Sequence, residues 1–153
     1  MTRWTLERFE ELVFLIGMAS ESYTFENPFT AGERIIMIRR ALSEAGIDLS
    51  RIITATIPTL EVGIGNVSQV LSYVPAIDAL VTRNFRIMRI FRDAGLKVIV
   101  PPAFDRARLK GEVIRRLMVE GDEDWKNRVP TEVYKYIEEI DGINRLKEIV
   151  RYE

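Results

Sequence analysis

Four short apolar runs alternate with segments of helical periodicity, and this alternation restricts the possible folds more than any other feature of the sequence. The runs are rich in apolar and β-branched residues, and they are residues 11–16, 51–57, 78–82 and 97–100. Helical segments are predicted at residues 2–9, 31–45, 66–74, 85–94, 110–120, 131–140 and 144–150. Strands that alternate with helices are typical of a parallel sheet with helices on both faces. The sequence therefore predicts an α/β fold, and its 153 residues fit one domain, 1–153.

The chain opens with a helical segment, residues 2–9, and not with a strand. In doubly wound folds the first strand usually lies at the middle of the sheet, beside the point where the strand order reverses. We therefore expect the first, central strand to be absent, which would leave unpaired backbone groups on two strands that face a gap. Either the sheet closes across this gap, or another segment or chain fills it. The last 30 or so residues are helical and charged, and we expect them to form a cap on one edge of the sheet.

A loop that runs into a helix, from Phe25 to Leu42, has strong helix-entry signals. Asn27-Pro28 ends the preceding element, because the residue before a proline is disfavoured in helical geometry. Thr30 and Glu33 have the spacing of a capping box, in which each side chain accepts a hydrogen bond from the other residue's backbone N–H. Gly46 follows the helix as a typical C′ residue. Helix entry explains Thr30 and Glu33 without any ligand.

Composition excludes several kinds of chemistry. The chain has no cysteine and no histidine, so it has no disulfide, no thiolate site and no imidazole base or metal ligand. Its 22 basic and 23 acidic side chains give a net charge of −1, which offers no general attraction for nucleic acid or membrane. No apolar run approaches the length of a spanning helix, and no signal peptide is recognisable. A cytoplasmic protein that binds neither nucleic acid nor membrane is the expectation.

Ligands of open α/β sheets bind beyond the carboxyl ends of the strands, so the candidate site lies in the segments that follow them. Gly17 follows the first strand, where small residues let a ligand approach the backbone; a plain turn is the alternative. Thr82 and Asn84 follow the third strand, and Asn84 either caps the next helix or contacts a nucleotide. Beside them stand three arginines that are explained as a solvated helix face or as an oligomer interface: Arg83, Arg86 and Arg89.

The helix after the fourth strand begins near Gly111, with Lys110 and Arg115 close to its start. A helix N-terminus presents free N–H groups and a partial positive charge, which suits a phosphate. Basic side chains there are otherwise unfavourable against the helix dipole, so a ligand role and a structural role are about equally supported.

Together these residues resemble the archaeal type of nicotinamide-nucleotide adenylyltransferase, a family of the nucleotidyltransferase superfamily. The motifs that carry the resemblance are residues 27–34, residues 101–104, the helix start Gly111…Ile114-Arg115-Arg116 and residues 138–146. The resemblance implies a Rossmann-like fold and the joining of ATP to nicotinamide mononucleotide, which gives NAD and pyrophosphate with Mg²⁺ present. It also implies a cytoplasmic homo-oligomer that binds ATP, nicotinamide mononucleotide or NAD. The nucleotide-binding positions would be Gly17, Thr82, Asn84, Gly111, Ile114 and Arg115.

The sequence also departs from the family pattern. The family begins with a strand and a Gly-Arg-Phe-x-Pro-x-His-x-Gly-His motif, and this chain shows neither. The family's Ser-x-Thr-x-x-Arg motif aligns with Lys110 to Arg115, where only the arginine is kept and Glu112 adds a charge that repels a triphosphate. Asn66, after Val62 to Gly65, replaces a tryptophan, Tyr23 replaces a histidine and Glu26 replaces a basic residue.

We therefore assign no catalytic residue and no protein metal site, and we expect this chain to have little or no adenylyl-transfer activity. The alternatives are a non-catalytic nucleotide-binding or assembly relative of the family, and a purely structural subunit.

Overall fold

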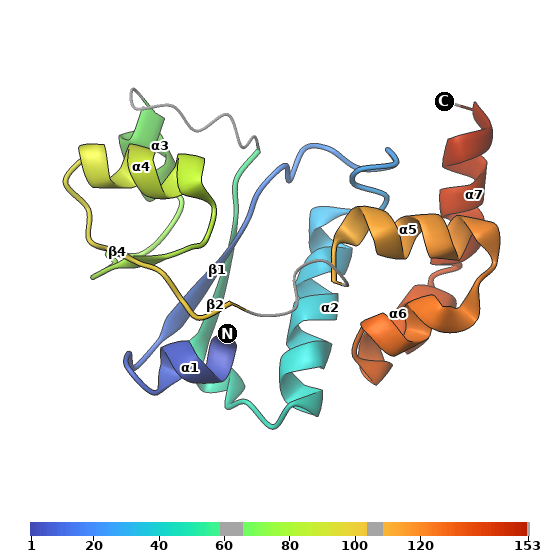
Figure 1. Cartoon of the computed structure of the whole chain (residues 1–153), viewed down its shortest axis with the longest axis horizontal. Helices are drawn as coiled ribbons and strands as arrows, with labels where there is room; N and C mark the ends of the chain where they lie inside the picture. Colours follow the sequence, from blue (N-terminus) through green and yellow to red (C-terminus); the bar gives the residue numbers. More distant parts are fainter. Residues whose placement is uncertain (59–65, 104–108, 153) are drawn as a thin grey trace.

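The computed structural model describes residues 1–58, 66–103 and 109–152. Strands and helices alternate along the chain as predicted (Figure 1). The strands are β1 Leu12–Ile16, β2 Ile52–Thr56, β3 Leu80–Val81 and β4 Val98–Ile99. The α-helices are α1 Thr2–Leu6, α2 Ala31–Glu44, α3 Val67–Leu71, α4 Phe85–Asp93, α5 Gly111–Glu120, α6 Thr131–Glu139 and α7 Gly142–Tyr152. Two 3₁₀-helices that the sequence did not predict are η1 Leu49–Arg51 and η3 Glu123–Arg128.

The strands form two separate parallel pairs. β1 pairs with β2 from Leu12↔Ile52 to Ile16↔Thr56, and β3 pairs with β4 through Leu80↔Val98 and Val81↔Ile99. Within the described residues, each pair is a sheet of its own, and no ladder joins β1 to β3. The predicted parallel α/β architecture is confirmed, and so is the predicted interruption of its sheet. The possibility that the sheet closes across the gap is wrong for this structure.

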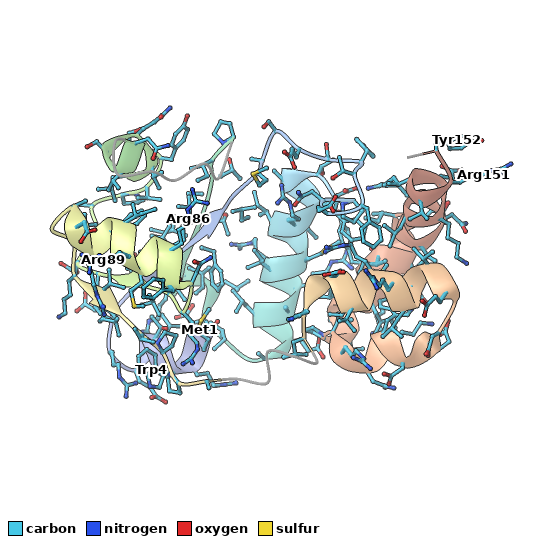
Figure 2. The ribbon with its side chains drawn as sticks, turned by 45° about the horizontal axis from the view of Figure 1, so that its top comes forward. Met1, Trp4, Arg86, Arg89, Arg151 and Tyr152 are labelled. Atoms are coloured by element: carbon cyan, nitrogen blue, oxygen red, sulfur yellow. The ribbon has the colours of Figure 1, made fainter. Side chains whose placement is uncertain are left out.

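The described buried side chains form two clusters at opposite ends of the molecule. One lies around α3 and α4 and contains Ile57, Val67, Val70 and Phe91. The other lies among α5, η3, α6 and α7 and contains Met118, Trp125, Ile137 and Leu146. In Figure 2, Arg86 and Arg89 on α4 lie at one end and Arg151 and Tyr152 on α7 lie at the other.

The C-terminal helices form a cap, but the cap packs on α2 and not directly on a sheet edge as the sequence had suggested. Helix α2 lies between this cap and strands β1 and β2 (Figure 1). The most extensive contact of the cap with α2 is made by α6, and α2 also contacts β1. The helical cap therefore reaches the strands through α2, because the apolar residue Met37 of α2 packs against the cap's own core cluster.

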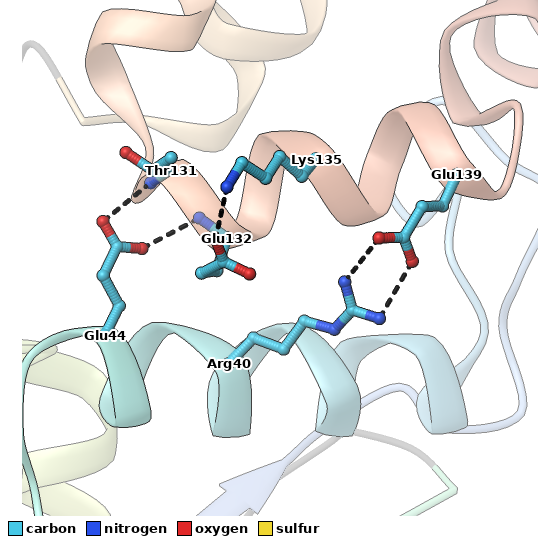
Figure 3. Close-up of polar contacts among 6 residues, drawn as sticks. All are labelled: Arg40, Glu44, Thr131, Glu132, Lys135 and Glu139. Atoms are coloured by element: carbon cyan, nitrogen blue, oxygen red, sulfur yellow. Dashed lines mark hydrogen bonds and ion pairs between the residues drawn. The ribbon is translucent and has the colours of Figure 1, made fainter.

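Polar side chains of α2 fasten α6 to it (Figure 3). The Glu44 carboxylate accepts hydrogen bonds from the backbone N–H groups of Thr131, at 3.1 Å, and Glu132, at 2.8 Å. The N-cap position of α6 is Pro130, which has no side-chain cap, so Glu44 satisfies the free N–H groups of another helix. These bonds, with the Glu132 N–H contributing most, hold the pKa of Glu44 below its ordinary value. Arg40, one turn before Glu44 on α2, donates to both carboxylate oxygens of Glu139, at 2.8 and 2.9 Å.

The capping box of α2 is confirmed. Thr30 Oγ1 accepts a hydrogen bond from the Glu33 N–H at 3.2 Å, and Glu33 Oε2 accepts one from the Thr30 N–H at 2.8 Å. Glu33 has a further partner that local rules do not predict, because Arg145 of α7 donates to both of its carboxylate oxygens, at 3.0 and 2.8 Å. Burial raises the pKa of Glu33, but the hydrogen bonds from Arg145 and Thr30 outweigh it, and the pKa lies below its ordinary value of 4.5.

The ion pair makes stability depend on pH in a predictable direction. A lowered pKa in the folded state stabilises the protein above the ordinary value of 4.5, and this contribution is lost as pH falls through the folded-state pKa. We expect Glu33→Gln, which keeps the cap acceptor, to lower the free energy of unfolding by about 1 kcal/mol at pH 7. The difference from the native chain should shrink as pH falls below 4.5 in urea-unfolding series.

The matched control is Glu112→Gln, which removes an exposed carboxylate paired with Arg116 one turn away, at 2.8 Å. Its expected cost is only about 0.3 kcal/mol at pH 7. Equal effects of the two substitutions at pH 7 would show that the Glu33–Arg145 pair has no special weight.

A glycine at the start of α7 permits the tight packing of the cap. A Cβ on Gly142 would lie 2.8 Å from Phe29 Cε1 and 3.1 Å from the backbone oxygen of Ile137. We expect Gly142→Ala to lower the free energy of unfolding by about 1–3 kcal/mol, because neither neighbour moves freely. Gly32→Ala in α2 is the control: its Cβ meets nothing closer than 3.9 Å, so better helix propensity should raise stability by up to about 1 kcal/mol. Urea unfolding of both variants measures the contrast, and a neutral Gly142→Ala would refute it.

Candidate functional site

The loop between β1 and α2 begins at the carboxyl end of β1 and is held there by one arginine. Arg34, in the first turn of α2, donates from Nη1 to the Gly17 carbonyl and from Nη2 to the Met18 carbonyl, both at 2.8 Å. Met18 has a left-handed backbone with a φ of 54°, and so does Tyr23 with a φ of 62°. Such positions are uncommon for side chains other than glycine, asparagine and aspartate, and they accumulate where loops are tightly constrained. The Gly17 carbonyl is therefore part of a braced turn.

The same loop reaches the start of α5. Phe25 packs against the C-terminal core cluster, and so does Ile114 of α5. The Arg115 guanidinium lies over the Phe25 ring, with its Cζ 5.4 Å from the ring centre. The loop therefore connects the carboxyl end of β1 with the N-terminal part of α5. Of the predicted site residues, Gly17, Gly111, Ile114 and Arg115 are gathered around it.

Two partly exposed arginines beside this loop each have one buried donor without a hydrogen-bond partner among the described residues. Among the described residues, the Nε atoms of Arg34 and Arg115 are buried and have no hydrogen-bond partner. Burial lowers the pKa of both arginines, and nearby carboxylates oppose this: Glu21 for Arg34, and Glu26 and Glu112 for Arg115. A buried donor without a partner costs about 1–3 kcal/mol. An arginine held in this way suits an anion, because a phosphate accepts several guanidinium N–H bonds at once.

The first turn of α5 is arranged around Arg115. The N-cap residue Lys110 makes no side-chain cap, and a Cβ on Gly111 would lie 2.8 Å from Arg115 Nη1. Gly111 therefore makes room for the guanidinium itself, in addition to any room it leaves for a ligand. The Glu112 carboxylate pairs with Arg116 at 2.8 Å on the exposed face of the helix.

Thr82 and Asn84 lie on the other side of the gap, at the end of β3. Asn84 Oδ1 accepts hydrogen bonds from the N–H groups of Arg86, at 3.0 Å, and Ile87, at 3.3 Å, so its predicted helix-capping role is confirmed. Thr82 Oγ1 accepts one from the Asn84 N–H at 3.1 Å. Both side-chain oxygens therefore shape the turn into α4. Arg83 donates to the Pro101 carbonyl at 2.6 Å and thereby links the ends of β3 and β4.

Sequence reasoning missed Arg34 as a site residue, although a usable signal was present. Arg34 is a basic residue in the first turn of a helix, the same unfavourable placement that drew attention to Lys110 and Arg115. Tyr23, at a position where the family has a histidine, lies under Arg145, whose Cζ is 5.3 Å from its ring centre. Asn66 stands before α3 without a side-chain cap, while its neighbours Val62 to Gly65 and the motif residue Phe104 lie outside the described residues.

The described residues show neither a metal cage nor a membrane helix. No group of three or more histidine, cysteine, aspartate or glutamate side chains in this part of the chain could hold a metal ion. None of the helices in the same residues combines the length and the apolar composition that a bilayer span requires.

Comparison with known proteins gives close relatives over almost the whole chain, although no protein-family model matches it. An uncharacterized protein of Archaeoglobus fulgidus is 54% identical over 147 residues, which are 96% of this chain and 84% of that protein. The nicotinamide-nucleotide adenylyltransferase of Saccharolobus solfataricus is 46% identical over 148 residues, which are 97% of this chain and 86% of the enzyme. The nicotinamide-nucleotide adenylyltransferase of Ignicoccus hospitalis is 42% identical over 149 residues, which are 97% of this chain and 87% of that enzyme.

Solved structures agree on the fold. A bifunctional NMN adenylyltransferase/ADP ribose pyrophosphatase from Francisella tularensis superposes with a TM-score of 0.71 at 15% identity, over 99% of this chain and 48% of that one. The same protein complexed with AMP and a manganese ion gives a TM-score of 0.67 at 17% identity, over 99% of this chain. This chain spans about half the length of that bifunctional protein, and at such identities the likeness shows the fold alone.

The unsatisfied donor of Arg115 predicts a test of its role without any ligand. We expect Arg115→Met to leave the free energy of unfolding unchanged or to raise it by up to about 1 kcal/mol, because a buried unpaired N–H group is removed and an apolar stem stays. Arg145→Met is the matched control, since it leaves the half-buried Glu33 carboxylate without its ion-pair partner, and it should cost about 1–3 kcal/mol. Urea unfolding at pH 7 measures both. If Arg115→Met is as destabilising as Arg145→Met, Arg115 has a structural role.

Proposed function

Because the chain belongs to the archaeal nicotinamide-nucleotide adenylyltransferase family, we propose that it binds a nucleotide at the junction of the β1–α2 loop and helix α5. The ligands are those of the family reaction: ATP, nicotinamide mononucleotide or NAD. We further propose that this 153-residue polypeptide by itself forms little or no NAD from ATP and nicotinamide mononucleotide. The observation that supports binding is the position of the Arg115 guanidinium over Phe25, with a buried Nε donor that has no hydrogen-bond partner among the described residues.

The start of α5 offers a phosphate two kinds of attraction. The helix has 10 residues, so its first-turn N–H groups and dipole give a partial positive charge, to which Lys110 and Arg115 add full charges. Against this, Glu26 and Glu112 lie close enough to act on the charge of Arg115. A phosphate ester with few charges fits this balance better than a bare triphosphate.

Magnesium enters this proposal with the nucleotide. The described acidic residues form no group that could hold the ion alone, so the phosphates of ATP would supply most of its ligands. When bound, Mg²⁺ would neutralise phosphate charge beside Arg115.

Two features oppose efficient adenylyl transfer. The chain has no histidine to stabilise a transferring phosphate, which the family resemblance would require. The described strands also form two pairs, so no ladder fixes the end of β1, with Gly17, against the end of β3, with Thr82 and Asn84. Transfer between two bound nucleotides depends on holding the reacting atoms within a fraction of an ångström of their productive positions.

An assembly role is the second candidate, and exposed aromatic residues beside arginines favour it. Phe85, at the start of α4, is 74% exposed and is followed by Arg86, while Tyr152 is 79% exposed next to Arg151. Figure 2 places Arg86 and Arg151 at opposite ends of the molecule. Aromatic and arginine side chains are enriched at protein interfaces. Two such patches at opposite ends suit a cytoplasmic homo-oligomer.

Calorimetry tests the binding proposal. We expect heat of binding with at least one of ATP, nicotinamide mononucleotide and NAD, and at least a tenfold weaker affinity in Arg115→Met, which corresponds to about 1.4 kcal/mol. Arg116→Met is the control, because Arg116 lies on the same helix with its side chain 65% exposed, and it should change affinity less than twofold. No heat with any of the three nucleotides would refute binding. Rapid NAD formation from ATP, Mg²⁺ and nicotinamide mononucleotide would refute the proposal of low activity.

A further inference from the structure

Four arginines recur at every third residue in one stretch of the chain. They are Arg83, Arg86, Arg89 and Arg92, and all four are exposed. The last three belong to helix α4, and Figure 2 shows Arg86 and Arg89 along this helix, at the end of the molecule away from α7. Residues 83–93 contain four arginines and one aspartate, a net charge of +3 in a chain whose overall charge is −1. We call the side chains of Arg86, Arg89 and Arg92 the arginine row.

The arginine row lies on the exposed face of an amphipathic helix. The opposite face of α4 packs into the buried cluster around α3 and α4, through Phe91 with Ile87 and Ile90 beside it. Residues three apart rise about 4.5 Å along a helix axis, so Arg86 and Arg92 are about 9 Å apart along α4. This separation is within the Debye length of about 10 Å at 0.1 M salt, so an approaching anion is attracted by the three charges together.

The charges of the arginine row are only partly balanced within the chain. Arg89 Nε pairs with Asp93 Oδ2 at 3.0 Å. The side chains of Arg86 and Arg92 form no hydrogen bond or ion pair with another described residue. Arg86 also lies in the first turn of α4, where a positive charge is unfavourable against the helix dipole, and like charges one turn apart repel each other. These local costs favour a negatively charged ligand, which would remove them.

An exposed aromatic ring stands at the start of the arginine row. Phe85, the first residue of α4, is 74% exposed. The preceding Asn84 caps the helix with its side chain, so the backbone that carries the ring is fixed. Proteins that bind single-stranded nucleic acid combine cations along the phosphate backbone with an aromatic ring on which a base stacks. The bases of a duplex are already stacked on one another, so the ring favours a single strand.

Other occupants fit this face less well. A helix that binds a membrane surface directs an apolar face to the lipid, whereas Ile87, Ile90 and Phe91 of α4 pack into the chain's own core. A second copy of the chain offers carboxylates, but several of those in its C-terminal cap are already paired within the chain. These are Glu123, Asp124, Glu138 and Glu139.

We propose that the arginine row and Phe85 form a binding site for single-stranded nucleic acid, in which the arginines bind phosphates and Phe85 stacks on one base. The expectation that the chain binds no nucleic acid rested on its net charge of −1, which averages over the whole surface. Attraction to phosphates acts within about one Debye length, so the local row decides it. The site is on α4 and not at the junction of the β1–α2 loop with α5, so it does not rest on the nucleotide binding proposed above.

Fluorescence anisotropy of the whole chain with a labelled oligoadenylate RNA of about 12 nucleotides tests the site. We expect binding at about 50 mM salt, with log K falling against log salt at a slope of about −2, the value for three phosphates neutralised on a single strand. Arg86→Gln combined with Arg92→Gln should weaken binding at least tenfold and bring the slope to about −0.7. Phe85→Leu should weaken binding about tenfold and leave the slope unchanged, because stacking releases no counterions.

The matched control is Tyr152→Leu combined with Arg151→Gln. This pair is also an exposed aromatic ring beside an arginine, but it lies at the other end of the molecule and outside the arginine row. The control should change the affinity for RNA less than twofold, because distant sites act independently. Arg115→Met should bind the RNA as the native chain does, and excess ATP should not displace the RNA.

Five results would overturn the proposal. The first three are no binding of the RNA, an equal loss of affinity in the control, and displacement by ATP or loss in Arg115→Met, which would place the strand at the nucleotide site. The fourth is equal affinity for a duplex together with no effect of Phe85→Leu, which would show unspecific attraction of a polyanion. The fifth comes from sedimentation: if Arg86→Gln with Arg92→Gln dissociates an oligomer that RNA leaves intact, a second copy covers this face. Calorimetry with nucleotides is a separate measurement, so either proposal can fail without the other.

Discussion

Helix α2 holds this molecule together, because polar side chains along it bind the β1–α2 loop, α6 and α7. Glu33 closes the helix's own cap and binds Arg145 of α7, and Arg34 grips the loop that leaves β1. Arg40 and Glu44 bind the two ends of α6. With its apolar face against the C-terminal core, α2 transmits the position of the cap to the strands. Displacement of this helix would disturb the candidate nucleotide site and the cap together.

The candidate site depends on this helix because the β1–α2 loop is braced at both of its ends. Arg34 fixes its start at Gly17 and Met18, and the packing of Phe25 and Phe29 against the C-terminal cluster fixes its end. Arg115 then lies over Phe25 with a buried donor that no described group satisfies. A buried, unsatisfied donor is the kind of local cost that proteins keep at functional sites. The half of the site near Thr82 and Asn84 belongs to the other strand pair. The interruption of the sheet is therefore one physical reason for the low activity that we propose.

Local signals in the sequence predicted much of the fold. Gly17, Pro58 and Pro101 marked the ends of three of the four strands, and Thr30, Glu33, Asn84 and Gly46 marked helix ends at the correct residues. The strands β3 and β4 are only 2 residues long, shorter than predicted, because the ladder between them contains only the pairs Leu80↔Val98 and Val81↔Ile99. The 3₁₀-helix η3 was not predicted, because the burial of Trp125 against α5 and α6 defines it and its periodicity is too short to read.

By itself, the sequence determined the α/β alternation, the capped helix α2 and the family relationship, since all of these rest on residues close together in the chain or on motifs in order. Only the tertiary structure decided that Glu33 binds Arg145, 112 residues away, that Glu44 caps α6, 87 and 88 residues away, and that Arg34 belongs to the candidate site. Capping rules act within one helical turn, so sequence spacing shows them. Desolvation of a guanidinium and the vacancy of a strand edge depend on which distant segments are nearby, and that is a property of the folded chain.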